Sequence, residues 1–206
     1  MEEFTAVFFI VCLSCYFLVN LDNILRKHKQ GKEAEAYAEI EPPSGFMMSI
    51  AARGTLICFI EMLLYPILIF ASLSSLLENF AYNLMPFMSY TQSLGLFLMG
   101  VGYVISIWSV IARGRYAVSW EMRNNQVLVT WGPYRYVRHP SYLAYFLMFI
   151  GLFALWPNPF TLVPLVAIPC YFHIAAREEQ LLAKRFGKEY REYQKKTGRF
   201  VPKIRK

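Results

Sequence analysis

Residues 90–112 have the sequence YTQSLGLFLMGVGYVISIWSVIA, which contains no Asp, Glu, Lys or Arg. A helix rises about 1.5 Å per residue, so about 20 apolar residues cross the roughly 30 Å hydrocarbon layer of a bilayer. This run is long enough to span a membrane as a helix. It therefore decides the fold class.

Four further apolar runs extend this pattern along the chain. Residues 4–21 and 54–77 are close to the length of a full span. Residues 141–156 and 160–176 are shorter and flank Pro-Asn-Pro at 157–159, which indicates a helical hairpin with a sharp turn. With 56% hydrophobic residues, the chain is too apolar for an ordinary soluble domain. We predict an all-α, polytopic membrane protein of about five transmembrane helices.

The basic residues predict how these helices cross the membrane. Three segments are rich in Lys and Arg, namely 22–53, 113–140 and 177–206, whereas 1–3, 78–89 and 157–159 contain none. Because basic segments stay in the cytoplasm, we expect the N-terminus outside and the C-terminus and active site inside. The first run lacks a basic n-region and a small-residue cleavage site, so we do not expect it to be a cleaved signal peptide. The membrane would be the cell membrane in a prokaryote and the endoplasmic reticulum in a eukaryote.

The net charge of +7 is concentrated in the last 30 residues. A basic tail that leaves a membrane span favours contact with anionic membrane lipids over nucleic acid. The four cysteines all lie in predicted spans, and the three histidines are scattered, so the spacing predicts no metal site.

Aromatic and charged residues gather around the start of the fourth run. Arg138 and Arg177 could orient an anionic substrate, and Glu178 and Glu179 could receive an ammonium group or ribose hydroxyls. The helix that begins at Pro140 offers amide donors. Tyrosine side chains could hold a cation, the tyrosines being Tyr134, Tyr136 and Tyr142. An interfacial cluster that caps a helix and anchors it at the membrane surface explains the same residues equally well.

No dinucleotide fingerprint, P-loop, HExxH or Gly-x-Ser-x-Gly motif occurs in the chain. A different ordered pattern does. It is Leu128-Val129-Thr130-x-Gly132-x-Tyr134-x-x-x-Arg138-His139-Pro140-x-Tyr142, then Asn158-Pro159, then Arg177-Glu178-Glu179, then Phe186-Gly187-x-x-Tyr190-x-x-Tyr193. This pattern resembles the isoprenylcysteine carboxyl methyltransferase family, whose wider group includes the phospholipid methyltransferases.

The resemblance implies a membrane enzyme that transfers a methyl group from S-adenosylmethionine and releases S-adenosylhomocysteine. The implied acceptor is the carboxylate of a C-terminal prenylcysteine, with the amine of a phospholipid as the alternative. Because a carboxylate is already ionised at neutral pH, its methylation needs alignment and desolvation more than acid–base catalysis. An NADPH-dependent membrane sterol reductase and a non-enzymatic, lipid-binding scaffold are the other hypotheses. Sterol reductases are normally longer than this chain.

The resemblance also assigns roles to residues of this chain. From this resemblance, taken with the apolar runs, we expect three membrane helices and a cytoplasmic loop at 1–112, and a donor-binding catalytic region with the helical hairpin and a cytoplasmic amphipathic helix at 113–206. The implied donor-binding residues are Gln126, Val127, Leu128, Val129, Tyr134, His139, Pro140, Ser141, Tyr142 and Glu178. The family places a substrate-facing arginine about one turn before this glutamate, where this chain has Ile174. The arginines left as catalytic candidates are Arg138 and Arg177.

Overall fold

The structure is a computed structural model, which describes residues 2–29, 45–73, 75, 88–114 and 127–203. Its helices are α1 (Glu2–Lys29), α2 (Phe46–Phe70), α4 (Met88–Arg113), α5 (Pro140–Leu155) and α6 (Leu162–Lys196), with a short 3₁₀ helix η2 (Gly132–Arg135). Within the described ranges there is no strand. The all-α prediction is confirmed.

Three of these helices are long and apolar enough to cross a membrane, at Glu2–Leu21, Phe46–Phe70 and Tyr90–Arg113. The apolar helix α5 is shorter, and α6 continues from an apolar first part into a charged second part. Large apolar side chains lie exposed on the outer helix faces, such as Leu56, Phe97 and Val166. Such faces suit contact with lipid, and the chain is an integral membrane protein. The number of spans stays a prediction.

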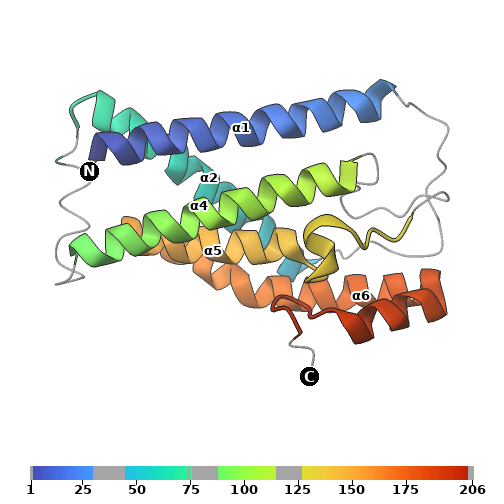
Figure 1. The fold of residues 1–206 in the computed structure, drawn as a ribbon. Helices are drawn as coiled ribbons and strands as arrows, with labels where there is room; N and C mark the ends of the chain where they lie inside the picture. Colours follow the sequence, from blue (N-terminus) through green and yellow to red (C-terminus); the bar gives the residue numbers. More distant parts are fainter. Residues whose placement is uncertain (1, 30–44, 74, 76–87, 115–126, 204–206) are drawn as a thin grey trace.

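The helices alternate in direction, so that α4 ends where α5 begins (Figure 1). Small residues let these two helices approach closely. A Cβ atom added to Gly95 would lie 2.6 Å from the carbonyl oxygen of Gly151, and one added to Gly102 would lie 2.9 Å from that of Ala144. Close backbone contact of this kind is a common way to pack helices in membranes. It fixes the end of α4 against the start of α5.

The turn between α5 and α6 is organised by Asn158, whose side chain is 3% exposed. Its Oδ1 accepts hydrogen bonds from the N–H groups of Phe160 (2.8 Å) and Thr161 (3.2 Å). The Thr161 hydroxyl donates in turn to the Asn158 carbonyl at 2.8 Å. These bonds satisfy amide groups that precede α6. They explain why Asn-Pro stands at the predicted sharp turn.

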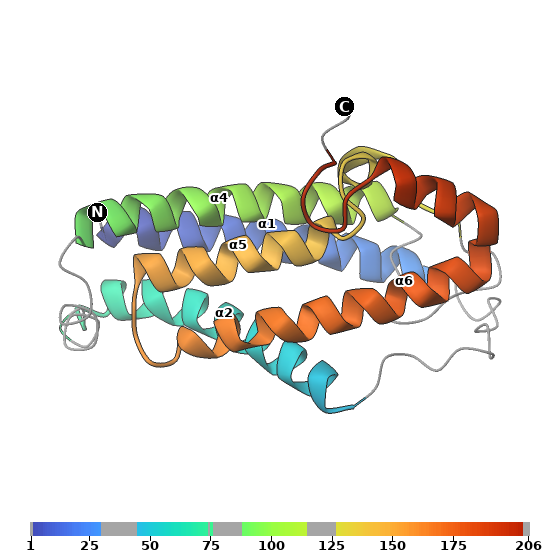
Figure 2. The ribbon, with the colours of Figure 1, turned by 90° about the horizontal axis from the view of Figure 1, so that it is seen from below.

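The predicted fifth span and the predicted amphipathic helix are joined in α6, but the helix breaks at Gly187. This residue has φ 52° and ψ −115°, outside helical geometry. Both views show the last part of α6 turning back toward the start of α5 (Figure 1 and Figure 2). The predicted amphipathic helix is therefore bent, and Tyr190, which follows the break, is fully buried.

Candidate active site

The loop before α5 is attached to the end of α4. The indole N–H of Trp131 donates to the Ala112 carbonyl at 2.9 Å. Gly132 has φ +60°, and a Cβ atom there would lie 2.8 Å from the Ala112 Cβ. Only glycine combines this backbone conformation with this approach. The turn places η2 and the residues after it beside the last turn of α4.

Residues 197–200, here called the C-terminal clasp, hold the other side of this loop. The N–H of Arg138 donates to the Gly198 carbonyl at 2.9 Å, and that of His139 donates to the Arg199 carbonyl at 3.1 Å. A Cβ atom at Gly198 would overlap the carbonyl of Val201. The break at Gly187 makes this contact possible, because it turns the chain back over the start of α5.

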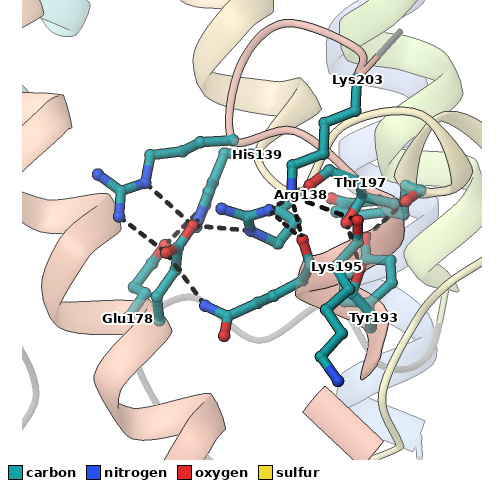
Figure 3. A network of polar contacts seen from close by, with 11 residues as sticks. Arg138, His139, Glu178, Tyr193, Lys195, Thr197 and Lys203 are labelled. Atoms are coloured by element: carbon teal, nitrogen blue, oxygen red, sulfur yellow. Dashed lines mark hydrogen bonds and ion pairs between the residues drawn. The ribbon is translucent and has the colours of Figure 1, made fainter. Parts of the chain in front are cut away.

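Figure 3 shows the polar network around Arg138, His139 and Glu178. Glu179 joins several members of this network. Its side chain is 7% exposed. Its Oε1 accepts from the Nε atoms of Arg138 (2.9 Å) and Arg199 (3.0 Å), while Oε2 accepts from Arg199 Nη2 at 2.8 Å. Arg138 also donates to the carbonyls of Thr197 and Gln194. The carboxylate thus joins α6, the loop and the C-terminal clasp.

The electrostatics of Glu179 follow from these partners. Burial alone would raise the pKa of its carboxyl group, but His139, Arg199 and Arg138 outweigh burial and hold that pKa below its usual range. The hydrogen bonds to Glu179 in turn raise the pKa of the Arg199 guanidinium. Glu179 is therefore ionised, and both of its carboxylate oxygens accept hydrogen bonds from arginine.

Glu178, the next residue, faces a different environment. Its Oε1 accepts from the Tyr142 hydroxyl at 2.7 Å, and its Oε2 lies 3.3 Å from His139 Nδ1. The rings of His139 and Tyr142 are stacked, with centroids 5.5 Å apart and planes inclined by 2°. With 27% of its side chain exposed, Glu178 presents a carboxylate beside an aromatic stack.

His139 connects the two glutamates. Its Nε2 lies 3.3 Å from Glu179 Oε1, although the alignment is not that of a hydrogen bond, so we treat this contact as electrostatic. Burial alone would lower the pKa of the imidazole, but Glu178 and Glu179 outweigh burial and raise that pKa. A charged imidazole here is held between two carboxylates.

Arg113 reaches the same region from the end of α4. Its Nη2 donates to the Ser141 hydroxyl at 3.2 Å. Its Nε is buried and has no hydrogen-bond partner among the described residues. The guanidinium lies within electrostatic range of Tyr134, Tyr142 and Glu178.

The structure places the predicted site residues in three groups. His139, Pro140, Ser141, Tyr142 and Glu178 lie together, as the sequence indicates. Tyr134 is buried beside them, and its carbonyl accepts from the Tyr193 hydroxyl at 2.6 Å. No hydrogen bond or ion pair among the described residues joins Val127, Leu128 or Val129 to this cluster, and Gln126 lies outside those residues. Of the arginines, Arg138 is bound to Glu179, whereas Arg177 is exposed.

Sequence reasoning did not assign site roles to Arg113 or Arg199. The one signal for Arg113 is that it ends the long uncharged run. For Arg199 there is none, because its contact with Glu179 depends on the break at Gly187. No group of three or more His, Cys, Asp or Glu side chains in the described segments could hold a metal ion.

The fold and site define a class: a polytopic helical membrane protein with an aromatic and charged cluster at one end of its helices. Residues 90–189 match the phospholipid methyltransferase family. Protein-S-isoprenylcysteine O-methyltransferase of Tribolium castaneum is 30% identical over 55% of this chain and 42% of that protein. The Saccharomyces cerevisiae protein of the same name is 32% identical over 66% of this chain and 61% of its own length.

A solved structure, that of the eukaryotic intramembrane Ras methyltransferase (isoprenylcysteine carboxyl methyltransferase), matches 76% of this chain and 52% of that chain. Its identity is 26% and its TM-score 0.48. On these sequence matches, the chain is similar to protein-S-isoprenylcysteine O-methyltransferases over part of its length. The chain spans less than two thirds of the length of the Tribolium and yeast relatives.

Proposed function

We propose that this protein transfers a methyl group from S-adenosylmethionine to the carboxylate of a membrane-embedded prenylcysteine. The observation that carries the proposal is the Glu178 carboxylate beside the stacked rings of His139 and Tyr142. A carboxylate suits hydroxyl or ammonium groups, and tyrosine faces suit a sulfonium cation. The similarity to the Tribolium and yeast protein-S-isoprenylcysteine O-methyltransferases supports the same activity.

The residues present fit such a donor, because some polar groups of the site are left without a partner among the described residues or open to a ligand. The buried Nε of Arg113 is unsatisfied by the described residues, and Glu178 is only half-buried. We propose that the donor is held by residues 126–129 together with Tyr134, His139, Pro140, Ser141, Tyr142 and Glu178. When bound, S-adenosylmethionine would supply an electrophilic methyl group. The acceptor oxygen would bond to the methyl carbon while the carbon–sulfur bond breaks, and the electron pair of that bond would stay on sulfur. No proton would be transferred.

The two catalytic candidates differ in what they can do. Arg138 is occupied by Glu179 and two backbone carbonyls, so we propose that it positions His139 and the start of α5. Arg177 directly precedes Glu178 on α6 and is exposed, so it is accessible to the polar end of an acceptor. We propose that this end of the helices faces the cytoplasm, with the N-terminus on the opposite side, and that the basic tail contacts anionic lipids.

Two measurements test this function. Calorimetry on detergent-solubilised protein should show micromolar binding of S-adenosylmethionine or S-adenosylhomocysteine, about −8 kcal/mol, with no binding of NADPH. Absence of donor binding rejects the proposal, and NADPH binding supports a reductase instead.

The acceptor is identified by transfer of a labelled methyl group to a panel of farnesylcysteine analogues and phospholipids. We expect transfer to the farnesylcysteine carboxylate. The match of residues 90–189 to the phospholipid methyltransferase family favours phospholipid amines as the second candidate. Transfer to phosphatidylethanolamine alone would establish that candidate.

A further inference from the structure

Arg113 has no anionic partner among the residues that the structure describes. Its Nε is buried and has no acceptor among the described residues, and its Nη2 donates to the neutral hydroxyl of Ser141. No carboxylate of the described residues lies within ion-pair distance of it. Because this Nε atom is buried, leaving it without an acceptor is unfavourable, and a bound anion would supply one.

A second feature favours an anion at the same place. Ser141 is the second residue of α5, and the first N–H groups of a helix have no carbonyl partner within the helix. These groups, together with the helix dipole, attract negative charge. The Ser141 oxygen accepts from Arg113 and so places the guanidinium at this helix start. The guanidinium and the helix start therefore present donors to one ligand group.

The position of Arg113 relative to the other charges indicates what kind of ligand would fit. Glu178 is within electrostatic range, but it is bound by Tyr142 and His139. The site thus has a carboxylate on α6, which contacts Tyr142 of α5, and an arginine on α4, which contacts Ser141 of α5. A ligand that carries both a cation and a carboxylate would be held at both ends.

We propose that Arg113, together with Ser141, binds a carboxylate of a ligand in methyl transfer. This inference rests on the proposed function, in which both the amino-acid part of the donor and the prenylcysteine carry a carboxylate.

The test uses two pairs of ligands that differ in one carboxylate. The donor pair is S-adenosylmethionine and decarboxylated S-adenosylmethionine, compared by calorimetry. The acceptor pair is N-acetyl-farnesylcysteine, as substrate, and its amide, as competitor. Both pairs are measured on the full-length unmodified chain and on Arg113→Met, Ser141→Ala and Arg53→Met. Arg53, exposed on α2, controls for the loss of one positive charge.

We expect Arg113→Met to weaken binding of the carboxylate-bearing member of one pair about 10- to 100-fold, the range for hydrogen bonds to charged groups. The member without the carboxylate should bind as it does to the unmodified protein. Ser141→Ala should give a smaller change of the same kind. A response in the donor pair assigns the site to the donor, and one in the acceptor pair assigns it to the acceptor.

The inference is overturned if Arg113→Met behaves like Arg53→Met, or if both members of a pair weaken equally. If Arg113→Met does not fold, Arg113→Lys is decisive, because it keeps the charge and removes the guanidinium geometry. The inference is also overturned if the lysine variant discriminates between the two members of a pair to the same extent as the unmodified protein. Failure of the unmodified protein to bind the donor would reject the proposed function itself.

Discussion

Glu178 and Glu179 are neighbours in sequence, yet they lie in two regions with different chemistry. Glu179 is closed in by Arg138, Arg199 and the C-terminal clasp, with 7% of its side chain exposed. Glu178 is 27% exposed and touches an aromatic stack. Successive residues of a helix point about 100° apart, so one carboxylate faces the protein and the other faces the site. We infer that Glu179 holds the parts of the site together, whereas Glu178 contacts the ligand.

The strongest way to break this comparison is Glu179→Ala. It would leave the buried Arg138 guanidinium without its counter-charge, and losing one partner of a buried ion pair costs about 3–5 kcal/mol. We expect a large fall in thermal stability in detergent, with donor affinity lost as a consequence. Glu189→Ala removes a carboxylate from an exposed position of the same helix and should change little. Equal melting temperatures for the two variants would contradict the assignment.

Glu178→Gln tests the other half of the comparison. The substitution keeps a hydrogen-bond acceptor for Tyr142 while removing the charge, so we expect thermal stability close to that of the unmodified protein. Donor affinity should fall about tenfold, or about 1.4 kcal/mol, as measured by calorimetry. A variant that loses stability as Glu179→Ala does, and not affinity alone, would mean that the two glutamates share one structural role.

Gly187→Ala tests whether the turn that brings the C-terminal clasp to Glu179 depends on glycine. A Cβ atom at Gly187 would meet nothing within 4 Å, but φ is +52°, so the penalty is backbone strain of about 1–2 kcal/mol. The expected outcome is a moderate fall in thermal stability and earlier proteolysis within 188–203. Lys188→Ala, at the next and exposed position, is the matched control. If both variants resist protease equally, the turn does not depend on glycine.

The two regions also differ in how far the sequence predicts them. Residues 138–142 and Glu178 fall together because each lies at an end of an apolar run, and run length is readable from composition. The bounds of α4 and α5 agree with the predicted runs for the same reason. The surroundings of Glu179 were not predictable, because Arg138, Glu179 and Arg199 belong to three separate segments. Their meeting depends on one backbone conformation, at Gly187, within an otherwise regular polar helix.

The smallest expected effect is the pH dependence of stability, which links the two regions through His139. Glu178 and Glu179 raise the pKa of the His139 imidazole against the effect of burial. The stabilising contribution of His139 is therefore full below its ordinary pKa of 6.5 and is lost as the pH rises through the raised value. The pKa of Glu179 is lowered, so its contribution is full above the ordinary 4.5 and is lost only in acid. The melting temperature should therefore be highest between these two values and decline toward alkaline pH. His139→Asn should flatten the alkaline decline while keeping the acid one. If the decline above 6.5 persists in that variant, another group carries it, and His139 does not couple the two carboxylates.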